Sequence, residues 1–206
     1  TDRQLFPRSV ADEFRRNDLE AMKANEAVEF EERVQTPHGE RTFLSVRFPL
    51  HDSEGIVYAV CTQSSDITAR KDAENQLRLA ARVFDHSGEG IVITDPKGLI
   101  MTVNEAFVTV TGYTEREVVG KRTTLLKSGK HSEEFYAEMW GTITAGRSWQ
   151  GEICNRHKDG STYWVDTTIV PVPGPDGRPK CYVATRTDVS RQKEQLRQIG
   201  RLASEQ

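Results

Sequence analysis

The chain repeats itself, and this repeat restricts its fold more than any other feature of the sequence. The matched segments are residues 17–32 with 137–152, residues 36–49 with 158–171, and residues 61–77 with the segment from 185 to 196. In the last pair, a strand-like stretch runs through Asp-Ile-Thr or Asp-Val-Ser into a charged helix. The same elements in the same order indicate two copies of one structural unit. We expect residues 1–66 to be the second half of what residues 85–188 contain whole.

The complete copy predicts an α+β fold. Alternating apolar residues and turn residues predict paired strands within 90–104 and strands over 149–157, 161–172 and 179–187, with helices over 104–114, 114–126 and 131–146. Thr114 and Glu117 have the spacing of a capping box, and Ser132 is placed to cap the third helix. Together these segments predict a five-stranded antiparallel sheet with helices on one face. Residues 67–84 and 189–206 are expected to form a linker helix and the start of a second one.

Composition excludes several classes of function. The 206 residues carry a net charge of −3 and a pI near 6.0, so the basic surface of a nucleic-acid-binding protein is not expected. No apolar run has membrane-spanning length, and membrane contact by this segment is not expected. The cysteines form no CxxC pair, and no histidine has metal-ligand spacing, so no metal site is expected. Because the chain starts at Thr1 and stops within a helical pattern, we expect a piece of a longer protein, which could still be membrane-anchored.

One strand directs an amide towards the interior. In residues 149–156, strand alternation places Trp149, Ile153 and Asn155 on one face. A buried amide needs a hydrogen-bond partner, because burial without one costs free energy. That partner is either a group of the protein or a bound ligand.

The order of elements and several short motifs resemble the PAS domain family. The motifs are Gly90–Asp95, Asn104–Phe107, Gly112-Tyr113, Gly120-Lys121, Asn155-Arg156 with Lys158–Gly160, and Asp188–Ser190, with Asp66–Thr68 and Phe48-Pro49 in the first copy. The resemblance implies a cytoplasmic sensor or dimerisation module of a bacterial signalling protein. Catalysis within this segment is not expected, because it has no nucleophile elbow, phosphate-binding glycine loop or paired carboxylates in a predicted cleft.

The second copy further resembles the PAS subgroup that binds flavin adenine dinucleotide (FAD) and senses redox state. This resemblance implies cofactor contacts from Trp140, Trp149, Asn155, Tyr163, Thr123 and Asn104. A flavin ring needs aromatic walls and a few directed polar groups, and these residue types supply both. Threading the first copy on the second places Leu19, Val28, Val34 and Thr42 at the four positions from Trp140 to Tyr163. Since these residues cannot make the same contacts, only the second copy is expected to hold FAD.

Other interpretations of the second copy stay open. Residues 120–129 lack the cysteine of the blue-light flavin subgroup, so adduct chemistry is not expected. His131 begins a helix that carries the axial histidine in haem-binding PAS domains, and a small metabolite could occupy the same pocket. A cofactor-free domain that only dimerises and relays a signal is the main alternative to FAD binding.

The two linker helices predict how a signal leaves the domain. Ala73, Leu77, Ala80, Ala81 and Phe84 recur at helical spacing, as do Val189, Gln192, Leu196, Ile199 and Ala203. We expect these stripes to pair in a parallel coiled-coil homodimer. Residues 195–206 resemble the helix that leads into diguanylate cyclases more than the one that leads into histidine kinases. The expected output is therefore a cyclic-di-GMP enzyme in the same chain, with a histidine kinase as the second choice.

Overall fold

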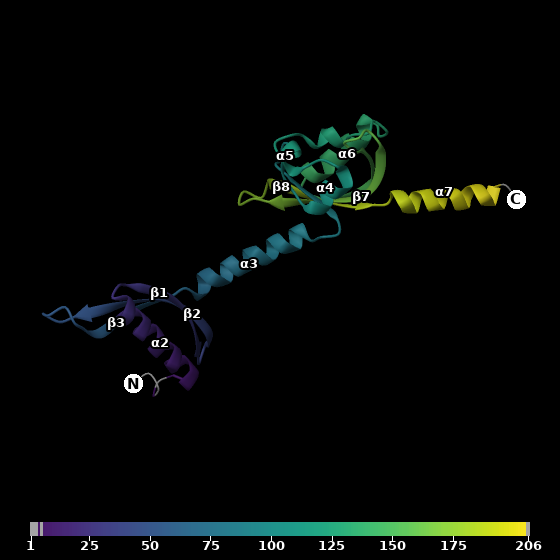
Figure 1. The fold of residues 1–206 in the computed structure, drawn as a ribbon. Coiled ribbons are helices and arrows are strands. Elements are labelled where there is room, and N and C mark those ends of the chain that lie inside the picture. The colour runs from purple at the N-terminus through teal and green to yellow at the C-terminus, as the bar shows by residue number, and fades with distance from the viewer. Residues whose placement is uncertain (1–3, 5, 205–206) are drawn as a thin grey trace. The chain divides into compact units, whose positions relative to one another are not determined.

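The computed structural model describes residue 4 and residues 6–204, which belong to two compact units, Thr1–Leu79 and Ala80–Gln206 (Figure 1). The first unit contains helix α2 (Arg8–Ala24) and strands β1 (Val28–Thr36), β2 (Gly39–His51) and β3 (Val57–Asp66). The strands pair antiparallel in the order β1-β2-β3, and α2 packs on this sheet through Ala11, Asn17 and Ala21. Helix α3 (Thr68–Asp85) follows and crosses the boundary between the units.

The second unit confirms the expected five-stranded antiparallel sheet. Its elements are β4 (Gly90–Thr94), β5 (Ile100–Val103), α4 (Glu105–Thr111), α5 (Glu115–Val118), η1 (Thr123–Leu126), α6 (Glu133–Thr144), β6 (Trp149–Arg156), β7 (Thr162–Pro173), β8 (Pro179–Asp188) and α7 (Ser190–Ser204). The strand order is β5-β4-β8-β7-β6, so the first and last parts of the unit meet where β4 pairs with β8. The helices between β5 and β6 cover one face of this sheet (Figure 1).

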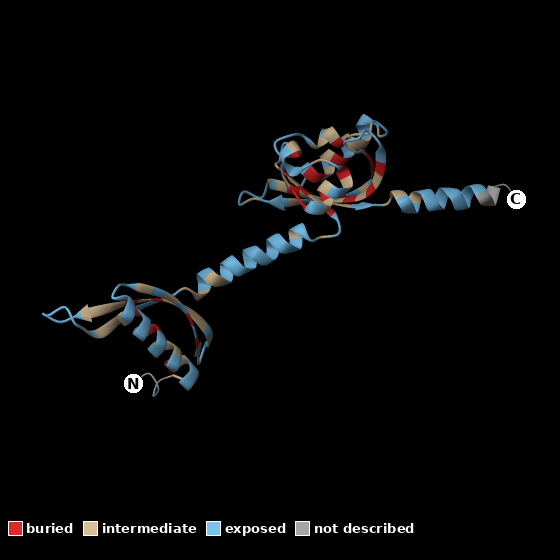
Figure 2. Cartoon of the chain, viewed as in Figure 1, coloured by how far each residue is buried: buried red, intermediate tan, exposed pale blue. Residues whose placement is uncertain are grey.

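The core of the second unit lies between the sheet and these helices, where Figure 2 shows the buried residues. Phe107, Ile100, Leu126 and Ile143 are its largest fully buried apolar side chains. Each contributes about 1.5–3 kcal/mol through removal of apolar surface from water. By contrast, α3 has no buried residue.

The helix predicted over 114–126 is wrong in its extent. The capping box of Thr114 and Glu117 is present, but α5 ends at Val118 and the short 3₁₀ helix η1 begins at Thr123. Between them, Gly120 has a φ of +77°, and its N–H donates to the Ile100 carbonyl at 2.8 Å. This segment therefore extends along β5, because Gly adopts positive φ without the strain that other residues meet there.

The register of the two sheets corrects one position of the internal alignment. Asn155 faces Tyr163 across β6 and β7, whereas Val34 faces Arg41, not Thr42, across β1 and β2. The predicted equivalence of Thr42 with Tyr163 fails because the first hairpin has the shorter turn. Leu19, aligned with Trp140, is 54% exposed on α2.

Candidate functional site

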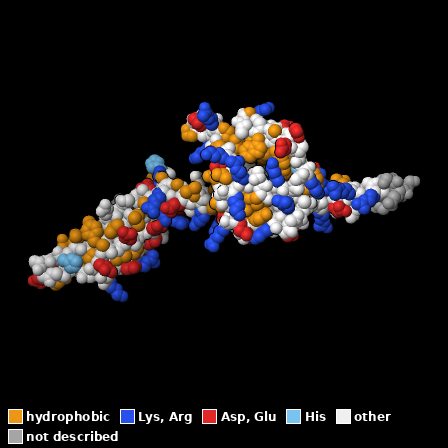
Figure 3. All heavy atoms as spheres, turned by 90° about the horizontal axis from the view of Figure 1, so that it is seen from above, with side chains coloured by type: hydrophobic (Ala, Val, Ile, Leu, Met, Phe, Trp, Pro, Cys, Tyr) orange, Lys and Arg blue, Asp and Glu red, His pale blue; other side chains and the backbone are white. Residues whose placement is uncertain are grey.

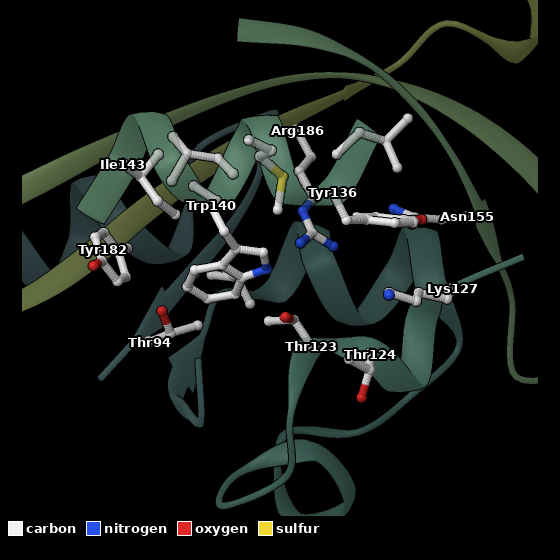
Figure 4. Close-up of a pocket in the computed structure, with 15 residues that line it drawn as sticks. Thr94, Thr123, Thr124, Lys127, Tyr136, Trp140, Ile143, Asn155, Tyr182 and Arg186 are labelled. Atoms are coloured by element: carbon white, nitrogen blue, oxygen red, sulfur yellow. The ribbon is translucent and has the colours of Figure 1, made fainter. Parts of the chain in front are cut away.

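A cavity opens between the sheet of the second unit and the segment from η1 to α6 (Figure 4). Its lining residues are Val92, Thr94, Thr123, Thr124, Lys127, Tyr136, Met139, Trp140, Ile143, Ile153, Asn155, Ile169, Tyr182, Ala184 and Arg186. About 620 Å³ of space here is not filled by atoms, including space open to solvent, but the centre of a water-sized sphere reaches only about 60 Å³. Side chains therefore occupy most of the room that a ligand of drug size would need.

Trp140 is the side chain that fills the middle of the cavity, as Figure 4 shows. Its ring packs on the Asp95–Gly98 turn so closely that a Cβ added at Gly98 would lie 2.8 Å from the indole. The ring also meets Tyr182, with ring centroids 5.9 Å apart in an edge-to-face arrangement. Trp140 thus lies at the predicted site, held between a turn and a strand.

Asn155 is 4% exposed and lines the cavity, as expected from strand alternation. Its Nδ2 is buried without a hydrogen-bond partner among the described residues, and so is the hydroxyl of Tyr163, which faces it across the two strands. Tyr163 itself stacks on His157 with centroids 4.0 Å apart, outside the lining. The Asn155 Nδ2 and the Tyr163 hydroxyl therefore interact across the two strands, but neither is in hydrogen-bonding geometry with any described residue.

Thr123 lines the cavity, but Trp149 and Asn104 do not. Trp149 packs edge-to-face on Phe135, and a Cβ at Gly151 would lie 2.8 Å from its ring. Asn104 has a structural role instead of the ligand contact expected for it. Its Oδ1 accepts from the N–H groups of Ile91 and Phe107, while its Nδ2 donates to the carbonyls of Phe84 and Glu89.

Arg186 is the functional candidate that the sequence analysis missed. Its Nε and Nη1 are shielded from solvent and lack hydrogen-bond partners, although the residue as a whole is partly accessible. Figure 4 shows its guanidinium group pointing into the cavity between Trp140 and Tyr136. Strand alternation in the sequence could have identified it, since Arg186 shares the inward face of β8 with Tyr182 and Ala184.

The charge of the lining is entirely positive. Lys127 and Arg186 line the cavity, and none of its lining residues is an Asp or Glu. The ammonium group of Lys127 lies 3.9 Å from the centre of the Tyr136 ring, whose hydroxyl is also buried without a partner. On the face of the molecule seen in Figure 3, acidic and basic side chains are interleaved. The cavity is thus a local concentration of positive charge in a chain of net charge −3.

Burial changes the acidity of the polar groups at this end of the cavity. It raises the pKa of the Tyr136 and Tyr163 hydroxyls above their usual range. Burial also lowers the pKa of Arg186, whereas electrostatic interaction with Tyr163 and Tyr136 raises it. Both effects show that these groups lie in a medium that disfavours uncompensated charge.

Other kinds of site are not found in the described part of the chain. Residue 4 and residues 6–204 contain no group of three or more His, Cys, Asp or Glu side chains that could hold a metal ion. His131 lies beside the core, where its Nε2 accepts from the Cys154 N–H at 2.8 Å. Among the described helices, none is long and apolar enough to cross a membrane.

Two protein-family models match the chain. "PAS domain" matches residues 88–191, and "PAS fold" matches residues 1–72. Among solved structures, a PAS domain from Colwellia psychrerythraea is 27% identical with a TM-score of 0.53, covering 56% of this chain and 98% of that one. An RNA-binding light-oxygen-voltage receptor is 14% identical with a TM-score of 0.54, covering 96% of this chain and 88% of that one, and shares the fold.

Three curated relatives are signalling or regulatory proteins by name. The nitrogen fixation regulatory protein of Klebsiella oxytoca is 34% identical over 52% of this chain, the bacterioopsin transcriptional activator of Halobacterium salinarum 36% over 61%, and the aerotaxis receptor of Escherichia coli strain K12 34% over 46%. The matches span only 22%, 18% and 18% of those relatives. The PAS domain match at residues 88–191 covers half of the chain and contains the five-stranded sheet and the cavity. The chain therefore belongs to the PAS domain family.

Proposed function

We propose that this chain is the sensory region of a signalling protein, and that its second PAS domain senses redox state through a bound flavin, FAD by resemblance. The observation that carries the proposal is the buried Nδ2 of Asn155, which is not in hydrogen-bonding geometry with any described residue and lies in a cavity walled by Trp140. A flavin ring offers a large apolar plane and a polar edge, so it would pack on the indole and satisfy the amide.

The relatives support a sensory role for the cavity. One is named an aerotaxis receptor, and a structure of the same fold is named a light-oxygen-voltage receptor. Redox sensing is favoured over light-driven adduct formation, because residues 120–129 contain no cysteine and Cys154 lies outside the lining. The coarse function is therefore sensing, and the flavin is the finer part of the proposal.

Binding requires a rearrangement of Trp140. The free space reached by a water-sized sphere, about 60 Å³, is far below the roughly 300 Å³ at which ligand pockets begin. Turning the indole off the Asp95–Gly98 turn would release its volume while keeping it as an aromatic wall. Trp140 then acts as the residue that closes the cavity when it is empty.

A direct covalent and hydrogen-bonded path runs from the cavity to α7. Asn155 faces Tyr163, and the next residue on β7, Trp164, holds the start of α7 by its backbone. Its N–H donates to Ser190 Oγ at 2.9 Å, and its carbonyl accepts from Val189 N–H at 2.9 Å. A shift of β7 caused by a change in the ligand would therefore move the first turn of α7.

The exit helices are suited to pair with a second copy of the chain. The apolar stripes of the two helices are left exposed at heptad positions. The exposed fraction is 72% for Leu77 of α3, and 68% and 63% for Leu196 and Ile199 of α7. Pairing in a parallel homodimer would bury them and carry a change in helix register to an output domain, for which a diguanylate cyclase is the proposed type. The side chain of Ala203, the last member of the α7 stripe, lies outside the described residues.

A cofactor-free relay module is the second candidate, favoured by the small free volume of the cavity. The visible spectrum of the purified protein, before and after dithionite, separates the two. We expect a flavin band that bleaches on reduction and that is lost or weakened in Trp140→Ala and Asn155→Ala. Trp164→Phe is the matched control, because Trp164 lies outside the lining. A protein that stays colourless after incubation with FAD and with the mononucleotide would favour the relay module.

A further inference from the structure

The two units of the chain treat buried arginine in opposite ways. In the first unit, Arg47 is 3% exposed, and its Nη1 lies 2.8 Å from Glu32 Oε1 in an ion pair that lacks hydrogen-bond geometry. Its Nε donates to Asp18 at 2.7 Å, and the rings of Phe14 and Phe30 lie 5.5 and 5.4 Å from its guanidinium carbon. The first unit therefore neutralises its buried cation internally.

The second unit leaves its buried cation uncompensated. Thr167 and Arg186 are opposite each other on β7 and β8, as Ser45 and Ser64 are on β2 and β3. The two serine hydroxyls lie 2.8 Å apart in hydrogen-bond contact, whereas the Thr167 hydroxyl and two guanidinium nitrogens have no partner in the described chain. At the same place in the same fold, one copy has a satisfied neutral pair and the other an unsatisfied cation.

The groups that face Arg186 do not supply an anion. Tyr136 on α6 and Tyr163 on β7 have their pKa raised by burial, so both are neutral near pH 7. Lys127, after η1, adds positive charge to the lining. Asp188 at the end of β8 is exposed and accepts from Ser190 N–H at 2.8 Å. The Nε and Nη1 of Arg186 are shielded from water without hydrogen bonds, and the ring of Phe107, 6.0 Å from the guanidinium carbon, carries no net charge. Shielding a cation in this way is costly, which points to an anion supplied by a ligand.

Resting on the flavin proposed above, we infer that Arg186 is the residue that keeps the reduced ring in its anionic form. A bound flavin would take up two electrons from a chemical reductant such as dithionite. It would take up two protons with them if the reduced ring is neutral, or one proton if the reduced ring is an anion. The anion places negative charge on the polar edge of the ring, where a desolvated guanidinium stabilises it. Arg186 would thus raise the midpoint potential of the bound flavin and set the charge of the reduced ring.

The dependence of the midpoint potential on pH tests this inference directly. With one proton taken up per two electrons, the potential changes by about 30 mV per pH unit, and with two protons by about 59 mV. The pH at which the slope changes marks the pKa of the reduced ring. We expect this break in Arg186→Gln to lie at least one pH unit above that of the parent protein, a tenfold or larger loss in anion stabilisation.

Two further variants separate a local effect from a change in net charge. Arg186→Lys retains the cation and is expected to return the break towards its original pH. Arg156→Gln removes the same charge from the neighbour of Asn155, but its side chain is exposed on the other face of β6, so no shift is expected. A colourless protein overturns the proposed function and this inference with it. Bound flavin whose break is the same in the parent and in Arg186→Gln overturns the inference alone.

Discussion

Replacing Arg186 by Met should stabilise the ligand-free protein. A buried charged group without a partner costs about 1–3 kcal/mol, or more for a full charge. The ring of Phe107, whose centroid is 6.0 Å from the guanidinium carbon, returns about 0.5–1 kcal/mol. Methionine is long, flexible and apolar enough to fill the same space. These terms leave a net gain of about 1 kcal/mol, or roughly 3–6 °C in melting temperature for a domain of this size.

The same substitution at Arg47 should have the opposite effect. It would leave Glu32, which is 3% exposed, as an uncompensated carboxylate within the first unit. Breaking a buried ion pair from one side costs roughly 3–5 kcal/mol. Arg47→Met is therefore a matched control, in which the same chemical change removes a compensated cation.

Urea unfolding can follow the two units separately. All three tryptophans lie between residues 140 and 164, so tryptophan fluorescence reports the second unit, while far-ultraviolet circular dichroism reports both. We expect the fluorescence midpoint to rise in Arg186→Met and to stay unchanged in Arg47→Met. A lower midpoint for ligand-free Arg186→Met would refute the reasoning, because it would mean that the protein itself stabilises this guanidinium group.

Three further predictions follow from single contacts. The Lys158 hydrogen bond holds the pKa of Glu117 at about 2. The ionised Glu117 carboxylate therefore stabilises the fold fully above pH 4.5, and this stabilisation is lost as pH falls towards 2. The stability of Glu117→Gln should depend less on pH in that range, most clearly at low salt, as acid unfolding would show. Gly98→Ala should displace the Trp140 ring and destabilise the second unit by about 1–2 kcal/mol, because its Cβ would meet the indole and its φ is +77°; near-ultraviolet circular dichroism and urea unfolding would show this. Ser190→Ala should increase amide hydrogen exchange in the first turn of α7 while leaving the sheet protected, and unchanged exchange there would contradict its anchoring role.

The sheet could be predicted from sequence because strand alternation and the internal repeat carry the same information. Asn155 and Ile153 are buried in β6 as their period of two requires. The exact register could not be predicted, because it depends on the length of the first hairpin turn, which the repeat comparison set one residue wrong at Thr42. The helix expected up to residue 126 failed for a related reason, since pairing with β5 overrides local propensity around Gly120.

The cavity was only partly predictable, because strand alternation fixes the face of a residue but not the direction of a large side chain on that face. Trp149 lies flat over Gly151 on its own strand, so it packs against the core instead of lining the cavity. The side chain of Asn104 makes four hydrogen bonds to the backbone, so it is not free to bind a ligand. A sequence motif does not show such hydrogen bonds. Arg186, in contrast, could have been found by extending to β8 the alternation argument that identified Asn155.

Under the proposed function, the distribution of charge around the two cavities distinguishes the two copies, because the cavity of the first unit is lined by Arg47 together with Glu32 and Asp18. A cation already neutralised by Glu32 and Asp18 gains little from any further anion, so the first unit has no strong preference between two states. A cation left unsatisfied, as at Arg186, lowers the stability of the empty domain and gives a ligand a correspondingly larger differential free energy. Since a ligand shifts an equilibrium only by that difference, the cost carried by Arg186 in the empty state would make the proposed sensor responsive.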